Sequence, residues 1–259
     1  MKRLRRLLIS LMITALMAAG MPMTAFAKPD WPSDTGIESE AGIVMDADSG
    51  AVLFGQNIHV QKAPASITKI LTALVVIENS SLDEQVTMTA TGVSGVTDGG
   101  ANISSQLDEV FTMEQCLYAI MVASANDIAL QIAEHVGGSV DGFVQQMNTR
   151  AQELGCTNTV FTNPTGLPDD NQHTTAHDMA LIMQAAIQNE SFRTIAAATS
   201  YTIPATNKAA ARNLTSKFTM TDTGSTGFYE GCIGGKEGYT EASGSTLVCA
   251  AQRNGMTLI

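Results

Sequence analysis

Three short strings, spread over most of the chain, constrain its fold more than any other feature of the sequence. In chain order they are Ser66-Ile-Thr-Lys69, Ser124-Ala-Asn126 and Lys236-Glu-Gly238. Together they contain a serine, a lysine one helical turn after it, a second hydroxyl, an amide and a late cationic strand. These groups can supply a nucleophile, its base, a proton relay and electrostatic stabilisation for acyl transfer. They can do so only if segments far apart in the sequence fold against one another.

Each string has an ordinary explanation when it is taken alone. A serine three residues before a lysine is expected about once by chance in a chain of this length and ordinary composition. Ser124 is expected to cap a helix, since Ser124-Ala-Asn-Asp127 has the pattern of a capping box. A lysine and a glycine near a strand end are ordinary turn chemistry. Only the ordered set therefore points to a site.

The first string places its two functional groups side by side. Ser66 and Lys69 are neighbours on one helix face, because residues three apart in a helix lie next to each other. Backbone N–H groups near the start of that helix also point at whatever binds there. A lysine with its ordinary pKa of about 10.4 is a poor base near neutral pH, so desolvation or a nearby cation has to lower that pKa. Lys236 is the candidate for that cation.

The first 27 residues have the pattern of a secretory signal peptide. A basic start, Met1-Lys-Arg-Leu-Arg-Arg6, is followed by an apolar run from Leu7 to Ala19 and then by Ala25-Phe-Ala27. The apolar run is shorter than the roughly 20 residues that a membrane-spanning helix needs. We therefore predict cleavage after Ala27 and an exported protein. Residues 28–40 are predicted to form an exposed entry segment.

The chain is acidic, with a formal net charge of −11. Removal of the signal peptide would remove four basic residues and no acidic ones, which leaves ten basic against 25 acidic residues and a net charge of −15. Without a basic cluster the mature chain has no electrostatic footprint for nucleic acid, and we exclude that class of partner. Its 44% apolar residues are sufficient for a core, and its length fits one large domain or two small ones.

The cysteines and histidines do not form a recognisable metal site. Four cysteines without a CxxC pair allow three disulfide pairings, and buried reduced thiols explain them equally well. His173 and His177 have i, i+4 spacing, but an HExxH motif and a further ligand group are lacking. We predict no metal and no cofactor. The four cysteines are Cys116, Cys156, Cys232 and Cys249.

Strand-like segments at both ends of the chain enclose a helical middle. Residues 42–47 and 51–55 flank Asp48-Ser-Gly50 and predict a hairpin. Apolar spacing predicts a helix from Pro64 to Glu78. Further helices are indicated by the recurrence of Phe143, Met147, Ala151 and Leu154 before Gly155, and by a capping-box pattern at Thr175-Ala-His-Asp178. Strand composition resumes at Tyr201-Thr-Ile203 and in three tail segments, 229–236, 245–251 and from 256 onward.

Together with longer segments, the three strings resemble the serine D-Ala-D-Ala carboxypeptidases, which are low-molecular-mass penicillin-binding proteins of the penicilloyl-serine transferase superfamily. The separations also fit this family, with 58 residues from Ser66 to Ser124 and 112 from there to Lys236. The resemblance covers nearly the whole mature chain. The longer segments are Ala63-Pro-Ala-Ser-Ile-Thr-Lys-Ile-Leu-Thr72, Asn158-Thr-Val-Phe-Thr-Asn-Pro-Thr-Gly-Leu167, His173-Thr-Thr-Ala-His-Asp-Met-Ala180 and Gly235-Lys-Glu-Gly-Tyr-Thr240.

The resemblance implies an α+β fold of the β-lactamase/transpeptidase-like type. In this fold an antiparallel sheet is packed by helices, a helical lobe lies on the other side, and the active site is in the cleft between them. We expect a D,D-peptidase domain from residue 41 to residue 259, with its helical lobe at about 83–190. Because residue 259 falls within an apolar run that has no stop signal, we also expect this domain to be truncated at its C-terminal end.

The resemblance also assigns roles to the first two strings. It makes Ser66 the acylated nucleophile, Lys69 its base and Ser124 the proton shuttle toward the leaving D-alanine. Asn126 would hold the substrate amide.

The third string and the residues after it would form a substrate-binding strand made of Lys236, Glu237, Gly238, Tyr239 and Thr240. Lys236 would supply positive potential. The backbone N–H groups of the nucleophile and of Tyr239 would form an oxyanion hole, in which each preorganised donor typically contributes about 10²–10³ in rate.

Glu237 departs from the family pattern. The family usually has threonine there, whose hydroxyl helps to bind the terminal carboxylate of the substrate. A like-charge contact at about 4 Å costs roughly 1 kcal/mol when exposed, and about 4 kcal/mol at an effective dielectric constant near 20. Either Glu237 opposes the substrate, or strand alternation turns it away from the cleft while the hydroxyl of Thr240 compensates.

The predicted function is a secreted serine D,D-carboxypeptidase that removes the terminal D-alanine from peptidoglycan stem peptides through an acyl-enzyme on Ser66. β-Lactam antibiotics are expected to inhibit it by acylating the same serine. One alternative is a β-lactamase-like hydrolase, although the sequence shows no glutamate placed with a partner asparagine to activate water. The other is a catalytically impaired peptidoglycan-binding homologue, an alternative motivated by Glu237.

Membrane contact is a further expectation from the resemblance. Family members commonly carry an additional sheet domain and an amphipathic C-terminal helix that lies on the membrane. The resemblance places the exported protein in the cell wall or at the outer face of the cytoplasmic membrane. Association with the membrane surface would take a segment beyond residue 259 and stays open. The preference for carboxypeptidase or endopeptidase substrates stays open.

Overall fold

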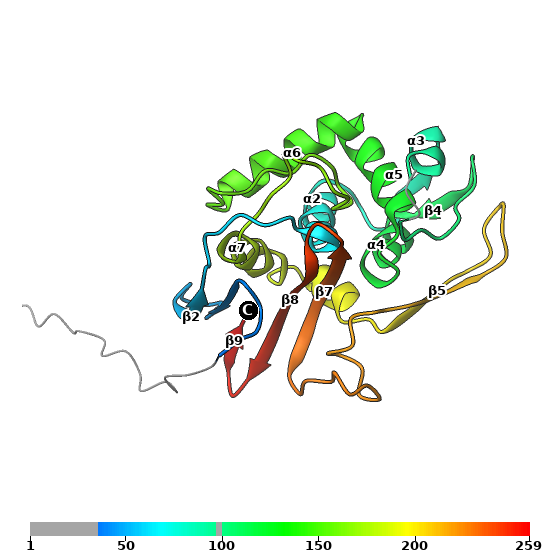
Figure 1. The fold of residues 1–259 in the computed structure, drawn as a ribbon. Helices are drawn as coiled ribbons and strands as arrows, with labels where there is room; N and C mark the ends of the chain where they lie inside the picture. The colour runs from blue at the N-terminus through cyan, green and yellow to red at the C-terminus, as the bar shows by residue number, and fades with distance from the viewer. Residues whose placement is uncertain (1–35, 97–99) are drawn as a thin grey trace, which may run out of the picture. The chain divides into compact units, whose positions relative to one another are not determined.

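An antiparallel sheet and a group of helices form the part of the chain that carries the three strings (Figure 1). The computed structural model describes residues 36–96 and 100–259, and the chain divides after Glu38 into two units. The fold and the site belong to the unit Ser39–Ile259. The predicted signal peptide and the first residues of the predicted entry segment lie outside the described residues.

The central sheet is built from the end of the chain. Strands β7, β8 and β9 pair antiparallel in that order, so β7 is an edge strand. The hairpin of β1 and β2 joins β9, since Met45 and Ile259 exchange two backbone hydrogen bonds of 2.9 Å. The predicted hairpin and the three predicted tail strands are confirmed. The strands are β1 (Gly42–Met45), β2 (Val52–Gln56), β7 (Cys232–Thr240), β8 (Gly244–Arg253) and β9 (Met256–Leu258).

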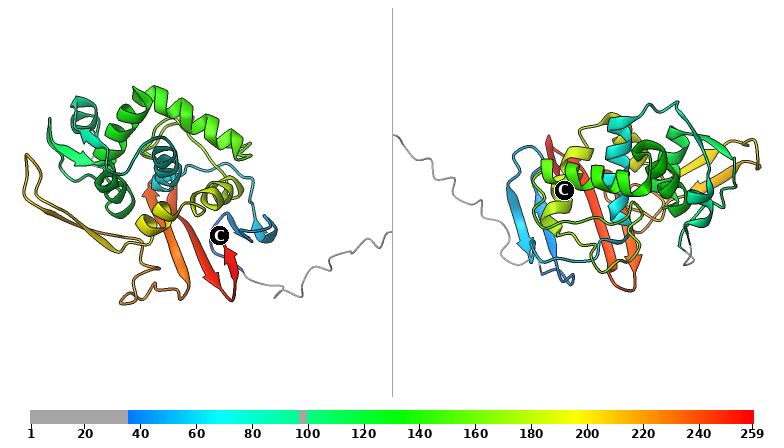
Figure 2. Two further views of the ribbon diagram at one scale, coloured as in Figure 1. Left: turned by 180° about the vertical axis from the view of Figure 1, so that it is seen from behind. Right: turned by 90° about the horizontal axis from the view of Figure 1, so that it is seen from above.

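Helix α2 is the centre of the helical part. It packs against α4, α5, α6, α7 and α8 and touches β7, and the views of Figure 2 show it between the other helices and the strands. Its residues from Lys69 to Val76 are all buried, as expected for a helix that is apolar on every side. The helices are α2 (Lys69–Asn79), α3 (Ala90–Ser94), α4 (Met113–Val122), α5 (Asn126–Gly137), α6 (Val140–Glu153), α7 (Ala176–Ala186) and α8 (Glu190–Ala196).

The predicted helix over 64–78 is confirmed, but its first turn is tighter than predicted. Residues Ala65–Thr68 form a 3₁₀ turn, η1, and the α-helix begins at Lys69. Short 3₁₀ turns are frequent at the N-termini of helices. The mixed architecture of helices and antiparallel strands confirms the predicted α+β class.

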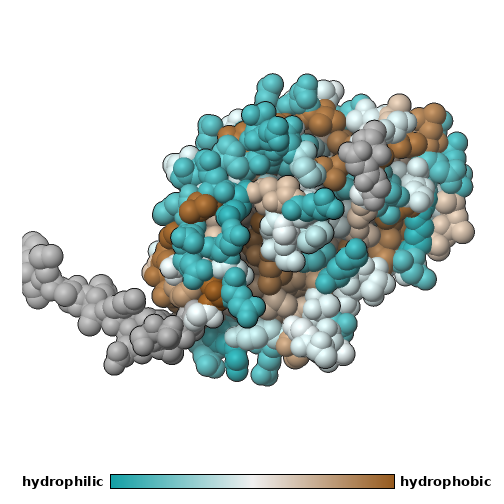
Figure 3. Space-filling view, viewed as in Figure 1, coloured by the Kyte–Doolittle hydropathy of each residue, from teal (hydrophilic) through white to brown (hydrophobic). Residues whose placement is uncertain are grey.

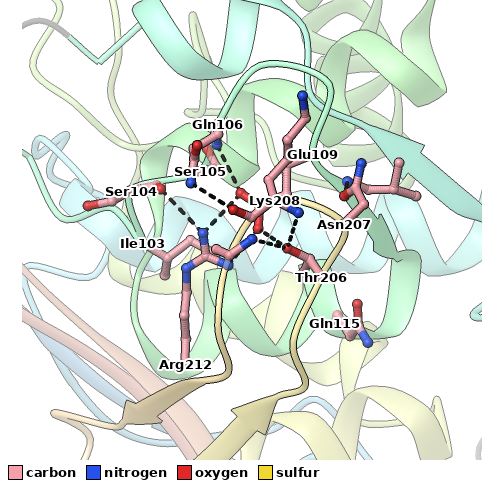
Figure 4. Close-up of polar contacts among 12 residues, drawn as sticks. Ile103, Ser104, Ser105, Gln106, Glu109, Gln115, Thr206, Asn207, Lys208 and Arg212 are labelled. Atoms are coloured by element: carbon pink, nitrogen blue, oxygen red, sulfur yellow. Dashed lines mark hydrogen bonds and ion pairs between the residues drawn. The ribbon is translucent and has the colours of Figure 1, made fainter.

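The hairpin of residues 200–215 is anchored to the loop before residue 110 by a buried ion pair (Figure 4). The guanidinium of Arg212 donates to both carboxylate oxygens of Glu109, at 2.7 and 2.9 Å. The hydroxyl of Thr206 donates to the same carboxylate at 2.5 Å, and the N–H of Gln106 donates at 2.9 Å. The pairs involved are β5 (Ser200–Ile203) with β6 (Arg212–Thr215), and β3 (Gln85–Thr87) with β4 (Val110–Thr112).

The predicted helix cap at Ser124 is wrong. Ser124 has φ = 58°, and α5 has Ala125 as its N-cap with no side-chain capping bond. Asp127, the expected partner in a capping box, instead accepts hydrogen bonds from the N–H and the hydroxyl of Ser105, at 3.1 and 2.7 Å. The carboxylate thereby holds a neighbouring loop rather than the helix end.

Other predicted helix ends are confirmed. Thr175 caps α7 by accepting the N–H of Asp178 at 3.0 Å. Gly155, with φ = 87°, follows the end of α6 in the left-handed conformation that glycine adopts readily.

The cysteines carry free thiols. Burial raises the pKa of Cys156 to about 12 and that of Cys249 to about 11, which makes both thiols poor nucleophiles. Among the described residues, no group of three or more His, Cys, Asp or Glu side chains is placed to hold a metal ion. Within residues 36–96 and 100–259, no helix is both long and apolar enough to cross a membrane.

Candidate active site

Ser66 lies in a strained turn that is held from two sides. Ala65, just before it, has φ = 53°, a value that residues with a side chain seldom adopt. Gly166 packs so closely on this turn that a Cβ at its position would lie 1.8 Å from the carbonyl oxygen of Ala65. From the sheet, the hydroxyl of Thr246 donates to the carbonyl of Pro64 at 3.0 Å. Strain of this kind persists only where the surroundings over-determine it, and such places cluster at functional sites.

The ammonium group of Lys69 is buried against three oxygens. Its Nζ lies 3.2 Å from Ser66 Oγ, 2.7 Å from Asn126 Oδ1 and 2.6 Å from the carbonyl oxygen of Thr165. A neutral amine has two N–H donors and one lone pair. The two shorter contacts are to pure acceptors and use both donors, so the lone pair is left for the hydroxyl of Ser66. This arrangement suits a base that removes the proton of Ser66.

The surroundings of Lys69 favour the neutral form. Burial is the largest cause that lowers the pKa of Lys69 well below its ordinary value, and the positive charge of Lys236 lowers it further. The negative charge of Glu237 acts in the opposite direction. Both lysines are 0% exposed. The sequence-based expectation that Lys236 is the cation beside Lys69 agrees with this electrostatic coupling.

The second string lies at the start of α5, between α4 and the loop before residue 106. The N–H of Asn126 donates to the carbonyl of Ala101 at 2.7 Å. Gly100 packs on the same side chain, and a Cβ there would lie 2.5 Å from Asn126 Nδ2. Ser124 is 9% exposed and precedes this contact by two residues. Its left-handed backbone turns the chain from α4 into α5.

Lys236 and Glu237 form an ion pair on the edge strand. Lys236 Nζ donates to the backbone carbonyl of Glu237 at 2.8 Å and to its Oε1 at 2.9 Å. Burial lowers the pKa of Lys236, and the charge of Glu237 offsets part of that effect. Of the two alternatives for Glu237, this contact favours the one in which its carboxylate opposes the substrate, because the carboxylate lies at the ammonium of the neighbouring lysine.

The rest of the strand lies directly against the nucleophile turn. A Cβ on Gly238 would lie 2.7 Å from the backbone nitrogen of Ser66, so only glycine fits there. Tyr239 is 69% exposed. The hydroxyl of Thr240 is 2.8 Å from Ser243 Oγ in the turn after β7. The hydroxyl of Thr240 is therefore bonded within the turn and does not take the place of the threonine missing at position 237.

Three residues that shape the site were given no role in it by their sequence patterns. The carbonyl of Thr165 binds Lys69, and Asn163 organises the turn around Thr165 by accepting the N–H of Gly166 at 2.8 Å. Asp127 holds the loop beside Asn126. Acidic and turn-forming residues next to a motif were the only available signals.

Hydrophilic and apolar residues both reach the face of the molecule seen in Figure 1. Apolar residues are visible near the middle of this face, at its left edge and at its upper right, with hydrophilic residues among them (Figure 3).

Comparison with known proteins shows the family of the chain. Residues 27–259 match the family described as D-alanyl-D-alanine carboxypeptidase. The chain belongs to this family. The resemblance inferred from the motifs is thereby confirmed.

Individual relatives and solved structures support the assignment. D-alanyl-D-alanine carboxypeptidase DacF of Bacillus subtilis is 34% identical over 99% of this chain, and the chain spans 65% of that relative's length. The crystal structure of the DD-transpeptidase of Streptomyces K15 superposes with a TM-score of 0.81 at 27% identity, covering 88% of this chain and 90% of that one. The D-alanyl-D-alanine carboxypeptidase structure from Mycobacterium tuberculosis gives a TM-score of 0.76 at 33% identity, covering 85% and 80%.

Proposed function

We propose that this protein is an exported serine D,D-carboxypeptidase that removes the terminal D-alanine from peptidoglycan stem peptides through an acyl-enzyme on Ser66. One observation carries the proposal. Lys69 is buried and its pKa is lowered, and its Nζ lies 3.2 Å from Ser66 Oγ. The two shorter hydrogen bonds of this Nζ go to Asn126 Oδ1 and to the carbonyl oxygen of Thr165. Family membership and the names of the relatives agree with this chemistry.

The first step is acylation. Neutral Lys69 takes the proton of the Ser66 hydroxyl while Oγ attacks the carbonyl carbon of the penultimate D-alanine. The backbone N–H groups of Ser66 and Tyr239 stabilise the negative charge that develops on the carbonyl oxygen. The C–N bond then breaks, and the proton reaches the leaving amine through the hydroxyl of Ser124. The product is an ester on Ser66 and free D-alanine.

The second step is hydrolysis of that ester. Water attacks the same carbonyl carbon and gives its proton to Lys69, and Oγ of Ser66 leaves and recovers a proton. Asn126 holds the lysine through Oδ1 and offers its amide N–H to the substrate backbone. A β-lactam would acylate Ser66 in the same way, but its leaving group stays tethered by the ring, which slows the second step.

The proposal includes the cellular setting of the reaction. A signal peptide over residues 1–27 would export the chain to the compartment where stem peptides occur. Association with the membrane surface would require a segment beyond residue 259.

Purified protein tests the proposal with two substrates. We expect a fluorescent penicillin to label the protein durably, and a peptide ending in D-Ala-D-Ala to release D-alanine. The variant Ser66→Ala should lose the label and lower the release of D-alanine by at least about 10³-fold. Ser49→Ala, in the exposed turn of the first hairpin, is the matched control and should change neither signal.

The other outcomes contradict the proposal in different ways. Rapid loss of the label would favour a β-lactamase. Absence of both signals in a folded protein would favour a non-catalytic peptidoglycan-binding protein.

A further inference from the structure

The turn of residues 163–167 lies outside the three motifs but supplies a hydrogen bond to the proposed base. The carbonyl oxygen of Thr165 lies 2.6 Å from Lys69 Nζ. We propose that Asn163 is a positioning residue for acylation, which holds this carbonyl so that Lys69 presents its lone pair to Ser66. The inference rests on the proposed function, because it concerns the same proton transfer.

The side chain of Asn163 is the centre of the hydrogen bonds in this turn. Its Oδ1 accepts the N–H of Thr165 at 3.1 Å, the hydroxyl of Thr165 at 2.7 Å and the N–H of Gly166 at 2.8 Å. Its Nδ2 donates to the carbonyl of Leu167 at 3.1 Å. One side chain therefore fixes the backbone of the three residues around the carbonyl that binds the base.

The peptide bond between Thr165 and Gly166 transmits the direction. A planar trans peptide points its N–H and its C=O in opposite directions. On one side the N–H of Gly166 donates to Asn163 Oδ1 at 2.8 Å. On the other side the C=O of Thr165 accepts from Lys69 Nζ at 2.6 Å. Asn163 therefore sets the direction of this carbonyl through one rigid unit.

The same peptide lies against the nucleophile. Gly166 has φ = 84°, which glycine adopts readily. A Cβ at this position would lie 1.8 Å from the carbonyl oxygen of Ala65 and 3.0 Å from the backbone nitrogen of Ser66. A change in the direction of this peptide would therefore disturb the base and the nucleophile together.

Other hydrogen bonds hold the ends of the turn. The hydroxyl of Thr72, one turn after the base on α2, donates to the carbonyl of Pro164 at 2.8 Å. The side-chain amide of Gln172 donates to the carbonyl of Leu167 at 3.0 Å. These contacts keep the segment in place without Asn163. Replacement of Asn163 is therefore expected to misdirect one carbonyl rather than to unfold the turn.

The direction of the Thr165 carbonyl decides what Lys69 offers to Ser66. While the carbonyl and Asn126 Oδ1 take both N–H groups of the neutral amine, its lone pair faces the hydroxyl. If the carbonyl turns away, one N–H becomes free to donate to Ser66 Oγ, and the lone pair no longer faces the proton. A misplacement of about 1 Å can lower a rate by about 10²-fold.

Stopped-flow labelling of the full chain with a fluorescent penicillin tests the inference. It yields the dissociation constant of the first complex and the rate constant of acylation within it. Asn163→Ala removes the acceptor, and Asn163→Asp keeps an acceptor oxygen. Asn189→Ala is the matched control, because Asn189 also accepts a backbone N–H, that of Phe192 at 3.1 Å, but at the start of α8.

We expect Asn163→Ala to lower the acylation rate constant by about 10²-fold and to leave the dissociation constant unchanged. Asn163→Asp should recover most of the rate at high pH. Its pH of half-maximal acylation should rise, because the added negative charge favours the ammonium form of Lys69, as the charge of Glu237 does. Asn189→Ala should match the wild type in both constants.

Several results would overturn this inference alone. They are wild-type acylation by Asn163→Ala, slow acylation by folded Asn163→Asp at every pH, and a raised dissociation constant with an unchanged rate constant. If Asn163→Ala does not fold, the rate and pH profile of Asn163→Asp decide. A folded wild-type protein that is not labelled would overturn the proposed function and this inference with it.

Discussion

Two clusters of buried charged side chains differ in how far hydrogen bonds and opposite charges compensate for their burial. In the cluster of Glu109 and Arg212, one carboxylate receives four hydrogen bonds, two of them from a single guanidinium. In the cluster of Lys69, Lys236 and Glu237, the carboxylate bonds to Lys236 and acts on Lys69 only through its charge, and its Oε2 has no donor among the described residues. The first cluster is satisfied, and the second is left unbalanced.

The pKa values follow from this difference. Burial alone would raise the pKa of Glu109, but the hydrogen bonds from Arg212 and Thr206 outweigh it and hold the pKa below its ordinary value. At Lys69 burial is not outweighed, and the pKa falls. A buried charge that keeps all its partners serves as an anchor for a hairpin. A buried amine whose hydrogen-bond partners are neutral oxygens can exchange its proton, and this is the property that a catalytic base requires.

The largest effect is expected from breaking the satisfied cluster. Arg212→Ala leaves Glu109 buried without its cation, so we expect a loss of about 3 kcal/mol in the free energy of unfolding. For a unit of about 220 residues this corresponds to a decrease of roughly 6–12 °C in Tm. Thermal and denaturant unfolding measure it.

A double variant serves as the control for this prediction. Glu109→Leu combined with Arg212→Met removes both charges, and most of the lost stability should return because no uncompensated charge is left. The contrast between the clusters would fail if Arg212→Ala cost less than about 1 kcal/mol. The direction in which stability changes with pH also follows from the pKa of Glu109. Because the folded pKa of Glu109 is lowered, the stability that this group contributes is present above its unfolded pKa and is lost as pH falls through the folded value.

The unbalanced cluster is tested by the pH dependence of acylation. Acylation of Ser66 by penicillin should accelerate as pH rises through the lowered pKa of Lys69, because only the neutral amine can take a proton. Lys236→Gln removes a charge that lowers this pKa, so the rising limb should move to higher pH. Glu237→Gln removes a charge that raises it, so the limb should move to lower pH. Stopped-flow labelling with a fluorescent penicillin measures both.

Displacement of the two limbs in the same direction would contradict the assigned electrostatics. Stability gives an independent check. Since the folded pKa of Lys69 lies below its unfolded value, the unfolded state binds more protons between the two, and stability should rise with pH across that window. The variant Lys69→Met should lack this part of the pH dependence.

The smallest effect is expected at a third, exposed pair. Arg150 donates to Glu78 at 2.8 and 3.0 Å, but the two side chains are 30% and 32% exposed. Arg150→Ala should change the free energy of unfolding by no more than about 1 kcal/mol, because water screens such a pair. A loss as large as that from Arg212→Ala would mean that burial does not distinguish these pairs.

Sequence patterns predicted the structure correctly where the geometry is set within a single helix, strand or turn. Ser66 and Lys69 could be placed together because both belong to one helical turn. The hairpin and the tail strands could be predicted because alternation and glycine turns are local signals. Thr175 could be assigned as a cap because the bond it makes is also local.

Local patterns failed where packing between elements decides. Ser124 and Asp127 have the letters of a capping box, but the loop at Ser105 captures the carboxylate instead. The contact of Lys69 with the carbonyl of Thr165 joins residues 96 positions apart, and a carbonyl has no signature in sequence. The direction of Glu237 could not be predicted either, because strand alternation gives the face from which a side chain starts and not the group that its flexible end reaches.

The close approach of Gly238 to the nucleophile turn has a consequence for how the protein can change under selection. One extra methyl group at that position would push against the nitrogen of Ser66, the atom proposed to stabilise both the natural reaction and its inhibition by β-lactams. Inhibitor and substrate would be excluded together. Variants that escape the proposed inhibition are therefore expected at positions other than 238.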